Sequence, residues 1–339
     1  MAIKVGINGL GRIGSQVLRK GIGNPELEFV AVNDLTDADT LAYLLKFDSV
    51  HGTFPGEVEA RGDVLVVDGR QIRVFSERDP AKIPWQSVGV ELVIESTGRF
   101  ESKDAASKHL QAGARKVIIT APAKGVERTL VYGVNEQTYD PAKHDVVAMG
   151  SCTTYALAPT LKVLDERFGI KRGFINTTHA YTNTQALLDH PVDSKRRCRS
   201  AAINLVPTTT GAARAIGEVL PQLKGRMDGL AIRAPVPDGS ILDTTCVLNR
   251  EVTVDEVNQA FREAAHQQPL GQVLRTNDAQ IVSTDVIGTR HSAIVDTTLT
   301  MASGDLVKVF TWYDNEAAFA LRVVDLAAYV AKRMPIGAR

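Results

Sequence analysis

Hydrophobic residues in the first 150 positions come in short runs separated by stretches with helical spacing. The runs predict buried β-strands at Ile3–Ile7, Phe29–Val32, Val90–Ile94, Lys116–Ile119 and Asp145–Ala148. Two stretches between them, Arg12–Lys20 and Lys103–Ala112, predict helices. Strands that alternate with helices are typical of a parallel sheet built from βαβ units.

The pattern changes after Ser151. Apolar residues at helical spacing predict a helix from there to Arg167, and Pro159 is expected to distort its early turns. Longer runs rich in β-branched residues then predict a largely antiparallel sheet, at Gly229–Arg233, Leu242–Leu248, Ser292–Thr300 and Leu306–Trp312. An apolar-rich stretch, Glu316–Arg333, predicts a final helix.

Together these patterns predict an α/β protein of more than one domain. We expect a Rossmann-type parallel-sheet domain at residues 1–150, an α+β domain with a largely antiparallel sheet at 151–316, and a C-terminal helical segment at 317–339. The length of 339 residues agrees, because a single hydrophobic core normally stops growing below that size.

Composition excludes several classes of protein. Hydrophobic residues make up 44% of the chain and charged residues 23%, which is ordinary for a globular protein. A formal net charge of zero argues against binding to nucleic acid or a membrane surface by bulk electrostatics. Three cysteines do not suggest a disulfide framework, and the first apolar run is too short for a signal or a membrane span. We therefore expect a cytoplasmic protein, and we predict no metal site.

A glycine motif follows the first predicted strand. Gly9, Gly11 and Gly14 fit G-x-G-x-x-G at the start of a helix, where glycines permit a tight turn and close approach of the backbone to a pyrophosphate. Asp34 ends the second strand 20 residues beyond Gly14. An acidic residue there accepts hydrogen bonds from ribose hydroxyls and repels a 2′-phosphate, so the sequence predicts NAD rather than NADP.

Cys152 lies where a strand gives way to a helix. Ser151 is a plausible N-cap, which places Cys152 in the first turn, where the helix N-terminus is expected to lower the thiol pKa. Cys246, within an apolar strand, fits an ordinary structural cysteine, and Cys198 lacks the strand-to-helix setting. His179 follows a β-rich run and is a candidate base for the cysteine. The chain has seven histidines, and a histidine chosen without further information is more often structural than catalytic.

Five motifs that occur in order closely resemble the phosphorylating glyceraldehyde-3-phosphate dehydrogenases. They are Gly6-Ile-Asn-Gly-Leu-Gly-Arg-Ile-Gly14, Ser151-Cys-Thr-Thr154, His179-Ala-Tyr-Thr182, Pro207-Thr-Thr-Thr-Gly-Ala-Ala213 and Trp312-Tyr-Asp-Asn-Glu316. The resemblance implies that residues 1–150 bind a dinucleotide, that 151–316 form the catalytic domain, and that the segment 317–339 packs back on the first domain. It also implies a homotetramer.

The resemblance further implies a reaction and its residues. Cys152 would attack the aldehyde of glyceraldehyde 3-phosphate with His179 as base, and inorganic phosphate would release the resulting thioester as an acyl phosphate. Directed donors and permanent charges suit two phosphate pockets. The matching positions are Ser151, Thr153, Thr182, Arg197, Thr210, Gly211 and Arg233.

For the cofactor, the resemblance carries over to a second set of positions. NAD would contact Gly9, Gly11, Arg12, Ile13, Gly14, Asp34, Arg78, Thr120 and Asn315, with Asn315 on the nicotinamide carboxamide. Pro191 matches a position where proline accompanies a preference for NAD.

The chain departs from the family pattern beside these positions. Tyr155 stands in place of asparagine, Met149-Gly150 in place of Asn-Ala, and Ala317-Ala318-Phe319 in place of Trp-Gly-Tyr; Ala234-Pro-Val-Pro237 also differs slightly. The sequence does not determine whether Tyr155 points into the pocket.

Two alternatives therefore stay open. One is a sibling dehydrogenase for another phosphorylated aldehyde such as erythrose 4-phosphate, and the other is a non-catalytic NAD-binding interaction protein.

Overall fold

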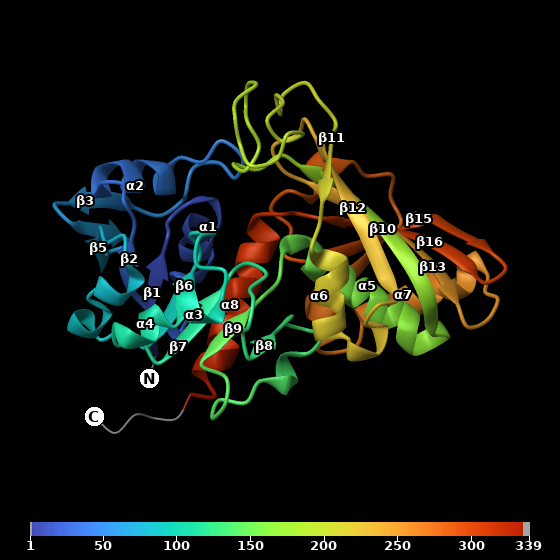
Figure 1. Cartoon of the computed structure of the whole chain (residues 1–339), viewed down its shortest axis with the longest axis horizontal. Helices are drawn as coiled ribbons and strands as arrows, with labels where there is room; N and C mark the ends of the chain where they lie inside the picture. The colour runs from blue at the N-terminus through green and yellow to red at the C-terminus, as the bar shows by residue number, and fades with distance from the viewer. Residues whose placement is uncertain (1, 335–339) are drawn as a thin grey trace. The chain divides into compact units, whose positions relative to one another are not determined.

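A computed structural model describes residues 2–334, which divide into two compact units. The first unit comprises the chain up to Leu130, Glu136–Gly150 and the chain from Ala320 onward; the second comprises Val131–Asn135 and Ser151–Phe319. Figure 1 labels the elements of both units. Of the predicted C-terminal segment 317–339, residues 335–339 lie outside the described part.

The first unit is built on one sheet with the strand order β3-β4-β5-β2-β1-β6-β7-β9-β8. Its strands are β1 (Ile3–Asn8), β2 (Leu27–Asn33), β3 (Val58–Arg61), β4 (Val64–Val67), β5 (Arg70–Phe75), β6 (Leu92–Glu95), β7 (Lys116–Ile119), β8 (Arg128–Thr129) and β9 (Val146–Ala148). Strand β1 pairs in parallel with β2 on one side and with β6 on the other. The strand order therefore reverses beside β1, and ligands of such sheets bind at the carboxyl ends of the strands at this point.

Strands β3, β4 and β5 were not predicted from the sequence. They pair antiparallel, and tight turns join them. Gly62, Asp68 and Gly69 have positive φ in these turns. An Asp-Gly dipeptide between two apolar stretches is a strong hairpin signal, so the sequence did hold the information.

Helices α1 (Arg12–Gly21), α2 (Ala38–Lys46), α3 (Lys103–Ala106) and α4 (Lys108–Gln111) also belong to this unit, with most of α8 (Ala317–Ala331). The single helix expected at 103–112 is divided at Ser107, whose carbonyl accepts from Leu110 N at 3.0 Å. A Cβ on Gly21 would lie 3.1 Å from Val324 Cγ2, so this glycine lets α1 and α8 approach closely.

The second unit is built on a mostly antiparallel sheet, as predicted, with the order β11-β12-β10-β13-β16-β15-β14. Its strands are β10 (Ile170–Ala180), β11 (Val206–Thr209), β12 (Met227–Ala234), β13 (Ser240–Leu248), β14 (Leu274–Asn277), β15 (Ala293–Ser303) and β16 (Leu306–Tyr313). The parallel pairs are β10 with β12 and β14 with β15. Helix α5 (Cys152–Phe168), continuous through Pro159, packs against this sheet together with α6 (Ala212–Val219) and α7 (Val254–Ala265).

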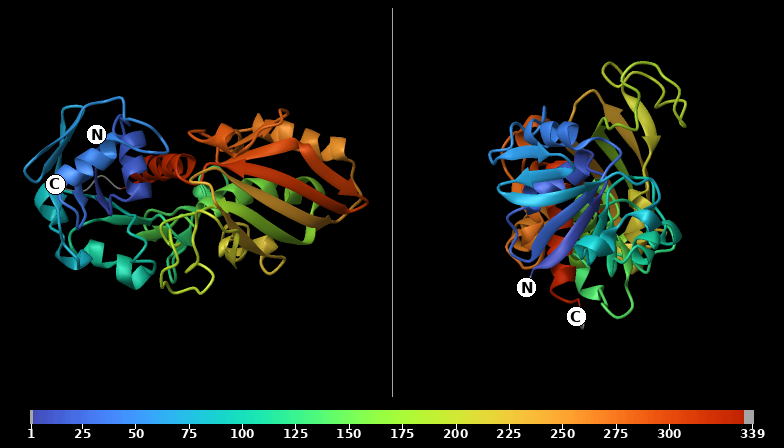
Figure 2. Two further views of the ribbon diagram at one scale, coloured as in Figure 1. Left: turned by 90° about the horizontal axis from the view of Figure 1, so that it is seen from above. Right: turned by 90° about the vertical axis from the view of Figure 1, so that its left-hand side faces the viewer.

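Several large apolar side chains of this sheet are exposed. Phe174, Leu230, Met301 and Leu306 share one face according to the strand register, and each is exposed. The long strands that carry them run side by side in Figure 2. None of the described helices is long and apolar enough to cross a lipid bilayer.

Candidate active site

The three motif glycines lie between the end of β1 and the start of α1. Gly9 has a φ of 90°, and a Cβ there would lie 2.9 Å from Thr97 N. A Cβ on Gly14 would lie 2.0 Å from Gly9 O, whereas one on Gly11 would meet no atom within 4 Å. The first and third glycines are thus required by close packing, and the second leaves open space at the start of a ten-residue helix.

A cavity of about 690 Å³ opens at the carboxyl ends of β1, β2 and β6. Its lining includes Gly9, Gly11, Asn33, Asp34, Arg78 and Thr97. The Asp34 carboxylate accepts from Leu10 N at 2.8 Å and from Thr36 N at 3.0 Å, so it is fixed at the cavity wall by the loop that carries the glycines. A helix N-terminus beside an open glycine, with a carboxylate nearby, suits a dinucleotide.

Two further residues predicted for the cofactor make contacts of their own. Arg12 in the first turn of α1 forms a two-point ion pair with Asp48, at 2.7 and 3.2 Å. Burial opposes ionisation of Asp48, but the Arg12 guanidinium and the N–H groups of His51 and Val50 outweigh it and hold the Asp48 pKa at about 2. Thr120 Oγ1 donates to the Glu95 carbonyl at 3.2 Å. Cofactor contacts of both residues stay predictions.

In the second unit, Cys152 is the first residue of α5. Ser151 is the N-cap, as predicted, and forms a capping box with Thr154: Ser151 Oγ accepts from Thr154 N at 3.2 Å, and Thr154 Oγ1 accepts from Ser151 N at 3.1 Å. The box fixes the first turn of the helix and with it the position of the thiol.

Cys152 meets His179 across the unit. The distance from Cys152 Sγ to His179 Nε2 is 3.3 Å. His179 Nδ1 lies 2.6 Å from the carbonyl oxygen of Ala180, which can only accept, and in the tautomer that donates this bond Nε2 is an acceptor facing the thiol. The imidazole is therefore oriented to take the proton of the thiol.

Arg233 lies beside this pair because strands β10 and β12 are parallel and pair His179 with Arg233. Arg233 Nη1 donates to the Ala180 carbonyl at 2.8 Å and lies equally close to His179 Nδ1. Its Nε, like the Nε of Arg197, is buried and has no hydrogen-bond partner among the described residues. The charge of Arg197 helps to lower the Arg233 pKa, after the larger effect of burial. Two cations with unused donors suit an anion.

The prediction that the helix N-terminus lowers the Cys152 pKa is wrong, because the net shift is upward. Burial raises the pKa of the thiol to about 11 and outweighs the positive charge of Arg233 and the Thr153 donors. Burial, followed by the charge of Arg233, lowers the His179 pKa to about 3. Both shifts favour the neutral forms, a thiol beside an uncharged imidazole, at neutral pH.

Comparison with known proteins agrees with this geometry. Residues 3–103 match the NAD binding domain of glyceraldehyde 3-phosphate dehydrogenase, and residues 151–315 match its C-terminal domain. Glyceraldehyde-3-phosphate dehydrogenase 1 of Bacillus subtilis is 54% identical over 334 residues, which cover 98% of this chain and 99% of that protein. The enzyme of Geobacillus stearothermophilus is 52% identical with the same coverage.

The chain belongs to the glyceraldehyde-3-phosphate dehydrogenase family. The resemblance and the Rossmann fold predicted from the sequence are confirmed, and so is NAD as the cofactor.

Tyr155, the largest departure from the family pattern, points into the core of the second unit. It is buried, and its hydroxyl accepts from Tyr132 N at 3.2 Å. Its ring packs edge-on against Phe319, with centroids 5.6 Å apart. Phe319 is itself a departure from the family pattern, so two of the departures are in contact with each other.

Sequence reasoning missed a buried row of hydroxyls behind the catalytic pair. Thr153 Oγ1 lies 3.0 Å from Tyr313 Oη, which lies 2.7 Å from Thr177 Oγ1. The Tyr313 ring also packs edge-on against the His179 ring, with centroids 5.8 Å apart. This row of hydroxyls lies behind Cys152 and His179 and supports both of them. Tyr313 was within reach of sequence reasoning, since it lies inside the quoted Trp312-to-Glu316 motif.

Ser240, also missed, orients Asn315. Its hydroxyl oxygen accepts from Ala180 N at 3.1 Å, and its hydrogen is donated to Asn315 Oδ1 at 2.7 Å. The Asn315 amide oxygen is thereby turned toward Ser240, and the NH2 group is left to donate elsewhere. The Asn315 NH2 group can thus serve as the donor that the oxygen of a nicotinamide carboxamide requires.

The other predicted phosphate residues make local contacts. Thr182 Oγ1 lies 3.0 Å from Thr184 Oγ1 in the exposed loop after β10. Thr210 Oγ1 accepts from Ala212 N at 3.2 Å, and Gly211 is the N-cap of α6. Their role in binding phosphate stays a prediction.

Proposed function

We propose that this chain oxidises glyceraldehyde 3-phosphate with NAD and inorganic phosphate to 1,3-bisphosphoglycerate, through a thioester on Cys152. The observation that carries the proposal is the 3.3 Å contact between Cys152 Sγ and His179 Nε2, which can accept the thiol proton when Nδ1 is the protonated nitrogen. Membership of the family supplies the substrate class.

The first step joins the thiol to the aldehyde. Cys152 Sγ forms a bond to the aldehyde carbon while its proton passes to His179 Nε2, giving a hemithioacetal. Burial favours this order of events, because the pKa of Cys152 is raised to about 11 and the free thiolate is scarce at neutral pH. The imidazolium then gives this proton to the oxygen that carries the developing negative charge, which completes the hemithioacetal and leaves His179 neutral for the next step.

The second step converts the hemithioacetal to a thioester. Bound NAD would accept the hydride that leaves the former aldehyde carbon as its C–H bond breaks. His179 removes the hydroxyl proton as the carbon–oxygen double bond re-forms, and the carbon stays bonded to Cys152. The Asn315 amide, which Ser240 orients, would hold the carboxamide of the cofactor.

The third step releases the product. A phosphate oxygen attacks the thioester carbon, the carbon–sulfur bond breaks, and Cys152 leaves as a thiolate that regains a proton from His179. Arg233 and Arg197 stabilise the anions with guanidinium groups whose Nε atoms have no partner among the described residues. Ser151, Thr153, Thr182, Thr210 and Gly211 complete the two phosphate pockets in this proposal.

The test is NADH formation by the purified protein with glyceraldehyde 3-phosphate and NAD, with and without phosphate. Turnover that depends on phosphate supports the proposal. Faster turnover with erythrose 4-phosphate would favour a sibling dehydrogenase, and turnover independent of phosphate would overturn the phosphorylating step. No turnover with bound NAD would favour a non-catalytic protein.

The degree of preference for NAD over NADP is tested at Asp34. Asp34→Asn removes a negative charge at the cavity and keeps an oxygen that can accept from Leu10 N. We expect the ratio of kcat/KM with NADP to that with NAD to rise about tenfold, because the 2′-phosphate is no longer repelled. Asp37→Asn, the same change at the exposed N-cap of α2, is the control and should leave the ratio unchanged. An unchanged ratio in Asp34→Asn would contradict the role of this carboxylate.

The homotetramer is also a proposal. It is supported by the open sheet face of Phe174, Leu230, Met301 and Leu306 and by Leu188 and Ile203 in the loop after β10, which are 75% and 80% exposed. Exposed apolar side chains that gather on one face are typical of protein interfaces. Sedimentation should give about four times the monomer mass; a 36.6 kDa species would contradict it.

We also propose a cytoplasmic location for this protein. All three cysteines are free, as expected in a reducing compartment. Cell fractionation tests it, and recovery outside the cytoplasm would overturn it.

A further inference from the structure

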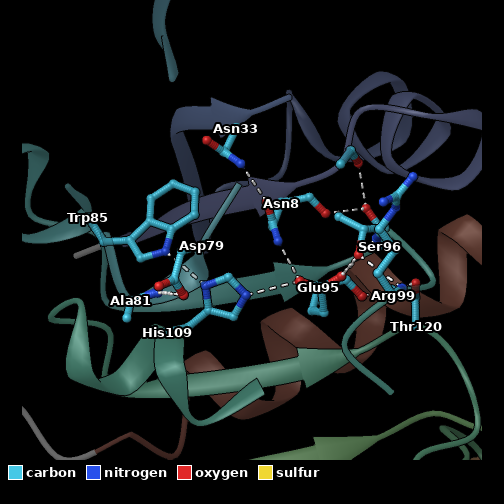
Figure 3. A network of polar contacts seen from close by, with 12 residues as sticks. Asn8, Asn33, Asp79, Ala81, Trp85, Glu95, Ser96, Arg99, His109 and Thr120 are labelled. Carbon is cyan, nitrogen blue, oxygen red and sulfur yellow. Dashed lines mark hydrogen bonds and ion pairs between the residues drawn. The ribbon is translucent and has the colours of Figure 1, made fainter. Parts of the chain in front are cut away.

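A buried row of polar side chains crosses the sheet of the first unit behind the cofactor cavity. Figure 3 shows Trp85, His109, Glu95, Asn8 and Asn33 connected in that order. Asn8, Asn33 and Glu95 end three neighbouring strands, and the register pairs Asn8 with each of the other two. His109 is fully buried and Glu95 is 2% exposed, so neither is part of the solvent-facing surface.

One end of the row is fixed by the main chain. Asn33 donates to Glu77 O at 2.9 Å and accepts from Glu77 N at 2.8 Å, so its amide has a single orientation. Asn33 Nδ2 also donates to Asn8 Oδ1 at 2.8 Å. Asn8 is therefore obliged to turn its NH2 group toward Glu95, where it donates to Oε2 at 2.6 Å.

The other end is fixed by an indole. Trp85 Nε1 lies 3.0 Å from His109 Nδ1, and an indole N–H can only donate. His109 Nδ1 is thus the acceptor, and its Nε2 carries the hydrogen that is directed at Glu95 Oε2, 3.0 Å away. Asn8 from one end and His109 from the other therefore both donate to the Glu95 carboxylate.

The second carboxylate oxygen holds the wall of the cavity. Glu95 Oε1 accepts from Thr97 N at 2.8 Å and from Thr97 Oγ1. Thr97 in turn packs against Gly9, since a Cβ there would lie 2.9 Å from Thr97 N. Asn8, Gly9, Asn33 and Thr97 all line the cavity.

We propose that Glu95 is a positioning residue for NAD: its buried carboxylate sets the shape of the cofactor cavity by holding Asn8 and Thr97 from behind. The inference rests on the proposed function only through its cofactor. Buried carboxylates with four donors are costly to disturb, because each donor left without an acceptor carries its full desolvation penalty.

The first experiment measures NAD binding to Glu95→Gln by calorimetry. With its NH2 group at the Oε2 position the glutamine faces Asn8 and His109, neither of which can reverse its direction, and with that group at the Oε1 position it faces Thr97 N, which can only donate. We expect the Kd for NAD to rise at least about tenfold, with kcat at saturating NAD and the KM for the aldehyde within about twofold of the parent. Glu91→Gln is the matched control: it removes the same charge at the other end of the β6 region, where Glu91 pairs with Arg115 at the surface, and should bind NAD like the parent.

A second pair of variants acts at His109, which is not in contact with the cavity. His109→Asn keeps an acceptor for Trp85 but loses the donor to Glu95, whereas His109→Gln places an amide where Nε2 was and restores that donor. We expect the Kd for NAD to rise about threefold or more in the asparagine variant and to recover in the glutamine variant. A purely structural role would lower the melting temperature of both without this split in affinity.

The outcomes separate the two claims. Parent-like affinity in Glu95→Gln, or equal affinities in the two His109 variants, would overturn the inference while the proposed function stands. If Glu95→Gln does not fold, the His109 pair decides. A parent protein that does not bind NAD would overturn the proposed function and the inference with it.

Discussion

Replacing Cys152 by serine should lower phosphate-dependent NADH formation by at least about a thousandfold. The serine hydroxyl would occupy the same place in the first turn of α5, but it is a weaker nucleophile and would form an ester that phosphate cleaves slowly. The measurement is the initial rate of NADH formation at saturating substrates, together with the Kd for NAD, which should not change.

The matched control is Cys198→Ser. Cys198 lies in the loop after β10, where its sulfur contacts the main chain of Val192 at 3.3 Å. This variant should keep the parent rate. A Cys152→Ser protein that retained more than about a tenth of the parent rate would require another nucleophile, because such a loss is far below that expected for a covalent catalyst.

Replacing His179 by asparagine should lower kcat by about 10²- to 10⁴-fold at neutral pH. The variant removes the acceptor Nε2 that lies 3.3 Å from Cys152 Sγ. Without it the thiol keeps its proton, because burial raises the pKa of Cys152 to about 11. The rate of the variant should therefore increase as the pH rises toward that value, since the thiolate fraction increases. The measurement is kcat as a function of pH.

His266→Asn is the control, because His266 is an exposed residue at the end of α7, and it should keep the parent profile. Loss of less than about threefold in His179→Asn would contradict the role of His179 as base. The double variant of Cys152 and His179 should be no slower than Cys152→Ser alone, because residues that act as a unit are not additive.

Local features of the cofactor and catalytic sites could be predicted from the sequence. The glycine motif, the position of Asp34 and the capping residue Ser151 depend on the conformation of a few neighbouring residues. The hairpin of β4 and β5 is local in the same sense, and its Asp68-Gly69 turn was there to be found. Short-range steric and hydrogen-bonding rules suffice for such features.

The buried row behind the cavity was less accessible. Glu95 is a polar residue at the carboxyl end of a predicted strand in a parallel sheet, which is itself a signal for a ligand site. Its partners His109 and Trp85, however, come from the segments flanking β6, and nothing in their spacing indicates that they meet.

By itself, the sequence determined the class of fold, the glycine loop and the placing of Cys152 in the first turn of a helix, because each follows from residues close together in the chain. The tertiary structure alone decided what surrounds that cysteine. It brought His179 and Arg233 together by pairing β10 with β12, turned Tyr155 into the core against Phe319, and raised the Cys152 pKa where the helix end alone would lower it. Strand register and burial depend on contacts between distant parts of the chain, and desolvation is a property of the folded surroundings rather than of neighbouring residues.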